Sequence, residues 1–128
     1  MNKIIPQLTV SNLKESLYFY TKILGFAITE TPTDRKVVIE LNNSRLLLHQ
    51  TDMSWGTTKL TYPYGVGINF QFLVKDLSPI YKNLKQNNYP LYDEYFTDAY
   101  SQTPTLSNDQ QIVVLDPDGY LLTLVLEQ

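Results

Sequence analysis

The sequence repeats one pattern of elements after an interval of 64 residues. In the first copy, Val10-Ser11-Asn12-Leu13 joins an extended apolar stretch to a helical one, and in the second copy Val74-Lys75-Asp76-Leu77 does the same. The two helical stretches also share their apolar positions: Leu13, Leu17 and Tyr20 in the first, and Leu77, Tyr81 and Leu84 in the second. A chain of two similar modules usually places its working site where the modules face each other, so the repeat indicates where to look.

Hydrophobic periodicity predicts the order β-α-β-β-β in each copy. The first copy is expected to have strands at 3–10, 26–31, 36–42 and 45–50, and a helix from a capping box at Asn12 and Glu15 to about Leu24. The second copy is expected to have strands at 67–74, 90–95, 110–115 and 120–126, and a helix that Asp76 caps and that ends near Gln86. We therefore predict an α+β fold with one domain over residues 1–128, made of a first module of about 1–60 and a second of about 61–128.

Polar side chains interrupt one face of two predicted strands. At 67–74, Ile68, Phe70, Phe72 and Val74 share one face, while Asn69, Gln71 and Leu73 share the other. The first strand repeats this arrangement, with Gln7 and Thr9 opposite an apolar face. The apolar faces should pack on the helices, so the amides would line the inside of a cup formed by curved mixed sheets. A shift of one residue in register would turn them onto the helix side.

The composition excludes several classes of function. Apolar residues make up 43% of the 128 residues and charged residues 18%, which suits a globular core. The chain has no cysteine, so disulfides and thiol catalysis are excluded, and it has no apolar run of the ~20 residues that span a bilayer. The first six residues lack the apolar core of a signal peptide, so a cytoplasmic protein is expected. The net charge is −3 without a Lys/Arg stripe, which argues against nucleic acid and weakly favours a cationic ligand.

Several segments resemble one known family. They are Leu8–Leu13 (LTVSNL), Ser16–Tyr20 (SLYFY), Ile23–Phe26 (ILGF) and Leu115–Leu122 (LDPDGYLL). In order and spacing they resemble the vicinal oxygen chelate superfamily, which includes glyoxalases, extradiol dioxygenases, fosfomycin-resistance enzymes and bleomycin resistance proteins. Tyr62–Gly65 and Gly67–Gln71 look like the bleomycin-resistance-type subgroup. The resemblance covers almost the whole chain and implies a paired β-α-β-β-β fold, usually a homodimer, with each cup enclosing a ligand.

The resemblance also implies where a metal would bind. In metal-dependent members the ligands come from the first and fourth strands of each module, and the corresponding positions here hold Ile5, Leu47, Asn69 and Thr123. None is His, Glu or Asp, whereas a divalent metal needs several imidazoles or carboxylates at about 2.0–2.6 Å. The only histidine, His49, cannot hold a catalytic metal alone. The chain therefore resembles the metal-free members, which bind a drug without transforming it, and we expect no cofactor.

The expected ligand-binding residues are inward amides, a histidine, a threonine and aromatic side chains: Gln7, His49, Trp55, Asn69, Gln71, Tyr100 and Thr123. The amides could orient a ligand or could hydrogen-bond to one another across the module boundary. The aromatic side chains, including Tyr62, Tyr64 and Tyr95, could close over a flat heterocycle or could anchor loops or a dimer contact.

Three further groups have a functional and a structural interpretation. His49 could be a general base, or a histidine at a strand end bonded to a neighbour or to water. Asp93, Glu94 and Asp98 could attract a cationic ligand, or could be solvated loop charges. Asp116-Pro117-Asp118-Gly119 is expected to form a turn without a chemical role.

Three functions remain open from the sequence. The first is a metal-free small-molecule binding protein, such as one that gives antibiotic resistance by sequestering a bleomycin-like drug or another aromatic cation. The second is a metal-dependent or acid–base lyase, isomerase or dioxygenase. The third is a partner-binding module whose cup is incidental.

Overall fold

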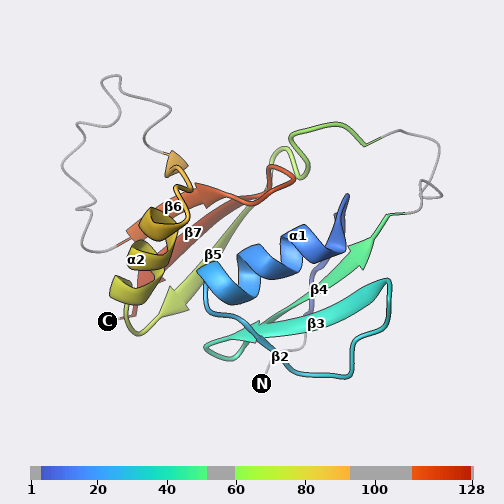
Figure 1. The fold of residues 1–128 in the computed structure, drawn as a ribbon, viewed down its shortest axis with the longest axis horizontal. Helices are drawn as coiled ribbons and strands as arrows, with labels where there is room; N and C mark the ends of the chain where they lie inside the picture. The colour runs from blue at the N-terminus through green and yellow to red at the C-terminus, as the bar shows by residue number, and fades with distance from the viewer. Residues whose placement is uncertain (1–3, 52–59, 93–110, 128) are drawn as a thin grey trace.

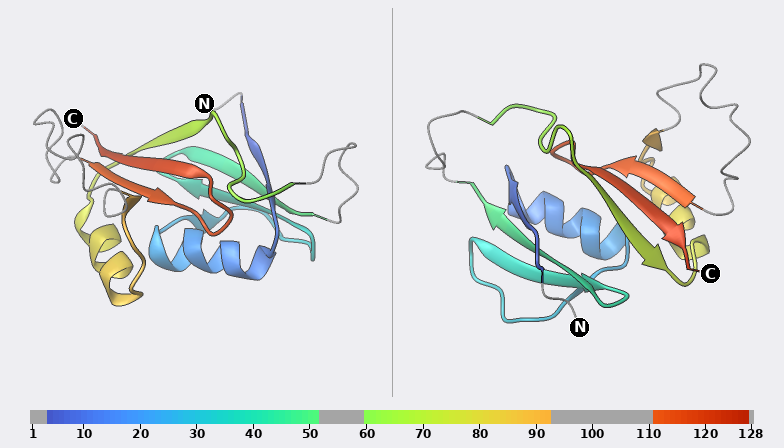
Figure 2. Two further views of the ribbon diagram at one scale, coloured as in Figure 1. Left: turned by 90° about the horizontal axis from the view of Figure 1, so that it is seen from above. Right: turned by 180° about the vertical axis from the view of Figure 1, so that it is seen from behind.

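Two β-sheets lie side by side, with both helices on the same side of them (Figure 1 and the left panel of Figure 2). This computed structural model describes residues 4–51, 60–92 and 111–127. The predicted α+β class is confirmed. The division into modules of about 1–60 and 61–128 stays a prediction, although the two sheets share one topology.

The first sheet has the strand order β1-β4-β3-β2. Its strands are β1 (Gln7–Val10), β2 (Ala27–Ile28), β3 (Lys36–Leu41) and β4 (Ser44–Gln50). β1 runs parallel to β4, and β3 and β4 form an antiparallel hairpin. The hairpin turns at Asn42 and Asn43, whose φ angles of 47° and 72° match the two-residue turn that the sequence predicts. β1 and β2 are shorter than the predicted strands.

Among the described residues, the second sheet has the order β5-β7-β6, which repeats the order β1-β4-β3 of the first sheet. Its strands are β5 (Asn69–Val74), β6 (Gln111–Leu115) and β7 (Leu121–Leu126), and β5 runs parallel to β7. Residues 90–92 form no strand, so the strand expected at 90–95 is wrong for its described part. Residues 93–95 lie outside the described part of the chain.

The first helix begins where the sequence predicts and then changes its geometry. Asn12 Oδ1 accepts a hydrogen bond from the Glu15 backbone N–H at 3.0 Å at the start of α1 (Leu13–Tyr18). Phe19–Ile23 continues as a π-helical turn, η1, and Gly25 follows with a φ of 93°. The second helix, α2 (Ser78–Gln86), starts two residues after Asp76, whose carboxylate accepts a hydrogen bond from Ser78 N–H at 3.0 Å.

The core lies between the helices and the helix-side faces of both sheets. The fully buried side chains come from both modules: Val10, Phe19, Tyr20, Leu24, Val37, Ile39, Leu46, Leu48, Leu84, Val114, Leu122 and Leu124. Edge-to-face ring contacts join Tyr20 to Phe26 and Phe26 to Phe72, which links the two modules through aromatic packing. Among the described residues, no helix has the length and apolar character needed to cross a membrane.

Candidate functional site

The amide-bearing face of β5 is the one that turns away from the helices. Phe72 and Val74 are buried against the helices and Phe70 is half-buried, whereas Asn69 and Gln71 are exposed. The predicted alternation is therefore confirmed for β5. β1 behaves in the same way, with Leu8 and Val10 buried and Gln7 exposed. We refer to the face of both sheets that turns away from α1 and α2 as the far face.

Strand register places the two glutamines in equivalent rows of the far face. In the first sheet, Gln7 pairs with Leu47 and Leu47 with Val38. In the second sheet, Gln71 pairs with Thr123 and Thr123 with Val113. β1 and β5 are edge strands, and they form the inner edges of the two sheets (right panel of Figure 2). We refer to these two rows, Gln7-Leu47-Val38 and Gln71-Thr123-Val113, as the central band.

The amide side chains of the far face do not hydrogen-bond to each other across the module boundary. Within the described residues, neither Gln7 nor Gln71 makes a side-chain hydrogen bond, and Asn69 makes one within its own sheet, accepting from Thr123 Oγ1 at 3.2 Å. The purely structural interpretation of the glutamines, that they satisfy one another, is therefore not supported. With respect to residues 4–51, 60–92 and 111–127, their polar groups remain available to solvent or a ligand.

The positions that correspond to metal ligands in relatives do not fit a metal here. Ile5 is 45% exposed and Leu47 is half-buried, and neither side chain has a donor atom. Thr123 is buried and uses its hydroxyl on Asn69. Within residues 4–51, 60–92 and 111–127, no three His, Asp or Glu side chains come together in a group that could hold a metal ion. These residues therefore do not form the carboxylate and imidazole site that a divalent cation requires.

His49 lies on the far face, next to the first row of the central band. It pairs in register with Thr9 on one side and Lys36 on the other, and its side chain is half-buried. The other two side chains of this row, Thr9 and Lys36, are not carboxylates. The proposed role of His49 as a general base stays a prediction.

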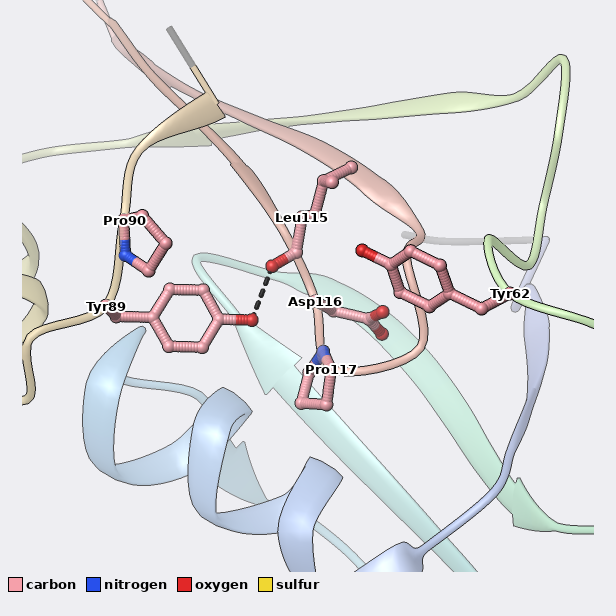
Figure 3. A pocket seen from close by; sticks show the side chains of 6 residues that line it. All are labelled: Tyr62, Tyr89, Pro90, Leu115, Asp116 and Pro117. Carbon is pink, nitrogen blue, oxygen red and sulfur yellow. Dashed lines mark hydrogen bonds between the residues drawn. The ribbon is translucent and has the colours of Figure 1, made fainter. Parts of the chain in front are cut away.

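Other predicted residues lie elsewhere. Trp55, Asp93, Glu94, Tyr95, Asp98 and Tyr100 lie outside the described residues. Tyr64 is half-buried and packs edge-to-face against Tyr120, with 5.9 Å between ring centroids. Tyr62 is exposed and lines a small pocket of about 160 Å³ beside the β6–β7 turn (Figure 3).

The β6–β7 turn does more than the sequence predicts. Asp116 forms the expected turn, because its carboxylate Oδ1 accepts hydrogen bonds from the N–H groups of Asp118 and Tyr120, both at 2.9 Å. Its other oxygen accepts a 2.7 Å hydrogen bond from the Tyr20 hydroxyl of η1. Asp118 accepts hydrogen bonds from the backbone N–H and the hydroxyl of Ser11, and the Tyr120 hydroxyl donates to the Thr9 carbonyl at 2.9 Å. We refer to Ser11, Tyr20, Asp116, Asp118 and Tyr120 as the hairpin seam.

Burial changes the acid–base properties of the hairpin seam. Burial raises the pKa of the Asp116 carboxyl from 3.8 to about 6, although the hydrogen bonds from Tyr20, Tyr120 and Asp118 oppose this rise. Burial and the neighbouring Asp116 charge also raise the pKa of Tyr120 to about 12. Tyr20 and Asp116 are far apart in sequence, so only a three-dimensional structure reveals that they meet. The signal in the sequence was an acidic turn followed by Tyr120, which we interpreted only as a turn.

Comparison with known proteins adds a family match. The sequence model of the Glyoxalase/Bleomycin resistance protein/Dioxygenase superfamily matches residues 4–124. No curated protein matches the chain.

Solved structures share the fold over nearly the whole chain. A virulence protein from Salmonella typhimurium has 18% identity and a TM-score of 0.64, with 100% of this chain and 98% of that one covered. A lactoylglutathione lyase from Agrobacterium tumefaciens has 16% identity and a TM-score of 0.62, with 98% and 94% covered. A glyoxalase/bleomycin resistance protein/dioxygenase from Alicyclobacillus acidocaldarius has 21% identity and a TM-score of 0.61, with 98% and 91% covered. At these identities the likeness concerns the fold alone.

Proposed function

The chain belongs to the glyoxalase/bleomycin resistance protein/dioxygenase superfamily, and from that premise we propose that it is a metal-free small-molecule binding protein of the bleomycin-resistance type. The observation that carries this proposal is the identity of the residues at the four positions where metal-dependent relatives hold their ligands. Ile5 and Leu47 supply hydrocarbon there, and Asn69 and Thr123 supply neutral polar groups. Without metal-ligating side chains at these positions, the far face of this fold can still bind a small molecule.

The hydrogen bond between Thr123 and Asn69 supports the proposal. The Thr123 hydroxyl is already used within the sheet, and Thr123 is buried, so it has little capacity to coordinate an ion. The exposed glutamines of the central band, in contrast, use neither their amide donors nor their carbonyl acceptor on any described residue, so these groups can serve a ligand. Binding without chemistry therefore accounts for the far face more simply than lyase, isomerase or dioxygenase activity.

Elemental analysis of the purified protein tests the metal-free part of the proposal. We expect less than about one tenth of an equivalent of zinc, nickel, manganese or iron, and no heat of binding when these ions are titrated in, because the mapped positions lack anionic or imidazole ligands. A stoichiometric metal that survives dialysis against a chelator contradicts the proposal and favours the enzyme.

A drug-binding role is tested with a bleomycin-type glycopeptide. The chain has one tryptophan, so its fluorescence reports on a single site. A saturable change at micromolar drug supports sequestration and hence antibiotic resistance, and no change rejects this ligand. A thermal-shift screen of small aromatic compounds then searches for others, because a ligand that binds only the folded chain raises its melting temperature.

We further propose that the protein is a cytoplasmic homodimer. Two apolar side chains support a surface for a partner chain: Leu73 on β5 is 52% exposed, and Ile68, the residue before β5, is 54% exposed. Light scattering should give twice the 14.8 kDa mass of one chain at micromolar concentration. A single-chain mass at that concentration contradicts the dimer without affecting ligand binding.

A further inference from the structure

The repeat places the same polar residue at the same position of both sheets. Gln7 and Gln71 are separated by the 64-residue interval of the repeat. Each lies on the inner edge strand of its sheet, beside the position that carries a metal ligand in relatives, Leu47 in one case and Thr123 in the other. Beyond that position each row ends in a valine, Val38 or Val113. The central band therefore presents two primary amides beside apolar side chains.

The two rows of the central band contain no charged side chain. At the far-face positions of β5, β6 and β7, the described residues include no Asp, Glu, Lys, Arg or His. On the first sheet, Glu40 is already paired with Arg45, with 2.9 Å between Oε1 and Nε, and Lys36 and His49 lie in the next row of the far face, outside the band. A cation placed on the band would lose its water without gaining a carboxylate, and an anion on the second sheet would gain no positive charge.

Primary amides recognise a particular kind of partner. Each offers two N–H donors and a carbonyl acceptor, so it pairs best with a group that has a donor and an acceptor side by side, such as an amide, an imide or a lactam ring. Neutral hydrogen bonds of this kind orient a ligand whose flat apolar body lies against valine, leucine and threonine methyl groups.

Resting on the proposed binding function, we propose that the central band takes an uncharged, flat ligand with an amide-like edge, and that Gln7 and Gln71 select it against cations and anions. This differs from the aromatic cation that the overall negative charge of the chain favours. We expect a neutral ligand because the charges nearest to it decide its electrostatic energy, whereas salt screens the charges elsewhere on the molecule.

Three probes of one shape test this inference: benzamide, benzamidine and benzoate, which are neutral, cationic and anionic at pH 7. The side-chain NH₂ signals of Gln7 and Gln71 in ¹⁵N-labelled protein report binding on the band. We expect benzamide to bind at least about tenfold more tightly than either charged probe, and the variants Gln7→Leu and Gln71→Leu each to weaken it about fivefold, as loss of a neutral hydrogen bond does. Gln86→Leu on α2 makes the same chemical change away from the band and should leave the affinity unaltered.

A change of preference gives a second readout. Gln71→Glu puts a carboxylate on the band and should make benzamidine the tightest probe. The inference is overturned if benzamidine or benzoate binds the unmodified protein as tightly as benzamide. It is also overturned if none of the three probes shifts the side-chain NH₂ signals of Gln7 and Gln71. These outcomes are separate from failure of the proposed function, which elemental analysis detects through a bound metal.

Discussion

Tyr20 and Asp116 share a buried 2.7 Å hydrogen bond that joins the first helix to the last hairpin of the chain. The Tyr20 ring is fully buried, and Asp116 is 2% exposed. A carboxylate in such a place costs free energy unless hydrogen bonds satisfy it, and here the Tyr20 hydroxyl and two backbone N–H groups donate to it. The hairpin seam therefore couples the modules through a group whose charge depends on pH.

The first prediction concerns pH. The pKa of the Asp116 carboxyl is about 6 in the folded chain, against an ordinary value of 3.8 that applies to the unfolded chain. The folded state therefore binds this proton more tightly than the unfolded state does. The resulting stabilisation is fully present below about pH 4 and is lost as pH rises through 6, by about 2–3 kcal/mol at most. Urea denaturation at pH 5 and pH 7.5 checks this by comparison with Asp116→Asn. The variant should lose more stability relative to the natural chain at pH 5 than at pH 7.5, and equal losses at the two values contradict the prediction.

The second prediction concerns the loss of the Tyr20 hydroxyl, which donates a hydrogen bond to Asp116. Tyr20→Phe leaves one oxygen of Asp116 without its hydroxyl partner in a buried place, so the free energy of unfolding should fall by about 1–3 kcal/mol at pH 7.5. Because the Tyr20 hydrogen bond lowers the pKa of Asp116, that pKa should also rise further in the variant. Denaturation and titration followed by carboxyl NMR measure the two effects. Tyr81→Phe at a half-exposed ring on α2 is the matched control and should change neither.

The third prediction concerns the glycine of the β6–β7 turn. Gly119 has a φ of 95°, and a Cβ added there would lie 2.6 Å from Pro63 Cβ and 2.7 Å from Pro63 Cα. Gly119→Ala should therefore cost at least about 2 kcal/mol, from backbone strain and from displacement of the 63 segment. Gly25 has a φ of 93° but no neighbouring atom within 4 Å, so Gly25→Ala isolates the strain and should cost about half as much. Equal melting temperatures for the two variants would show that the Pro63 contact is unimportant.

The fourth prediction tests the faces of the second sheet with two adjacent leucines. Leu122 is fully buried against the helices, whereas Leu121 is half-buried on the far face. Leu122→Ala should lower the free energy of unfolding by about 2–5 kcal/mol, and Leu121→Ala by less than about 1.5 kcal/mol. A reversed order of the two losses indicates a shift of one residue in register. That shift would also turn Thr123, the neighbour of Gln71, toward the helices.

Much of the fold follows from local signals. The alternation in β5, the Asn42-Asn43 turn and the cap at Asn12 each depend on a few neighbouring residues, and each is confirmed. The strand at 90–95 was wrong in its described part, because Pro90 cannot donate to a ladder and a short apolar run does not distinguish a strand from a packed loop.

The site was predictable only in part. That Gln7, Asn69 and Gln71 lie on the face opposite the helices follows from a period of two, and the structure agrees, although their place inside a cup stays a prediction. That the glutamines have no hydrogen-bond partner among the described residues does not follow from sequence, because it depends on the distance between two sheets that share no strand. The hairpin seam was missed for the same reason. Its bonds join residues of opposite modules, as Ser11 to Asp118 and Thr9 to Tyr120 show.

The parallel pairing of β1 with β4 and of β5 with β7 constrains the order in which the chain acquires its structure. In each module the opening strand has no partner until the closing strand exists, so a long loop must close before that ladder gains any hydrogen bond. The β3–β4 hairpin and α1 are local and can form early, whereas β1 and β5 dock late. In native-state amide exchange, β1 should therefore open more readily than the hairpin beside it, which makes the strand that carries Gln7 easier to remodel around a guest molecule than β3 and β4.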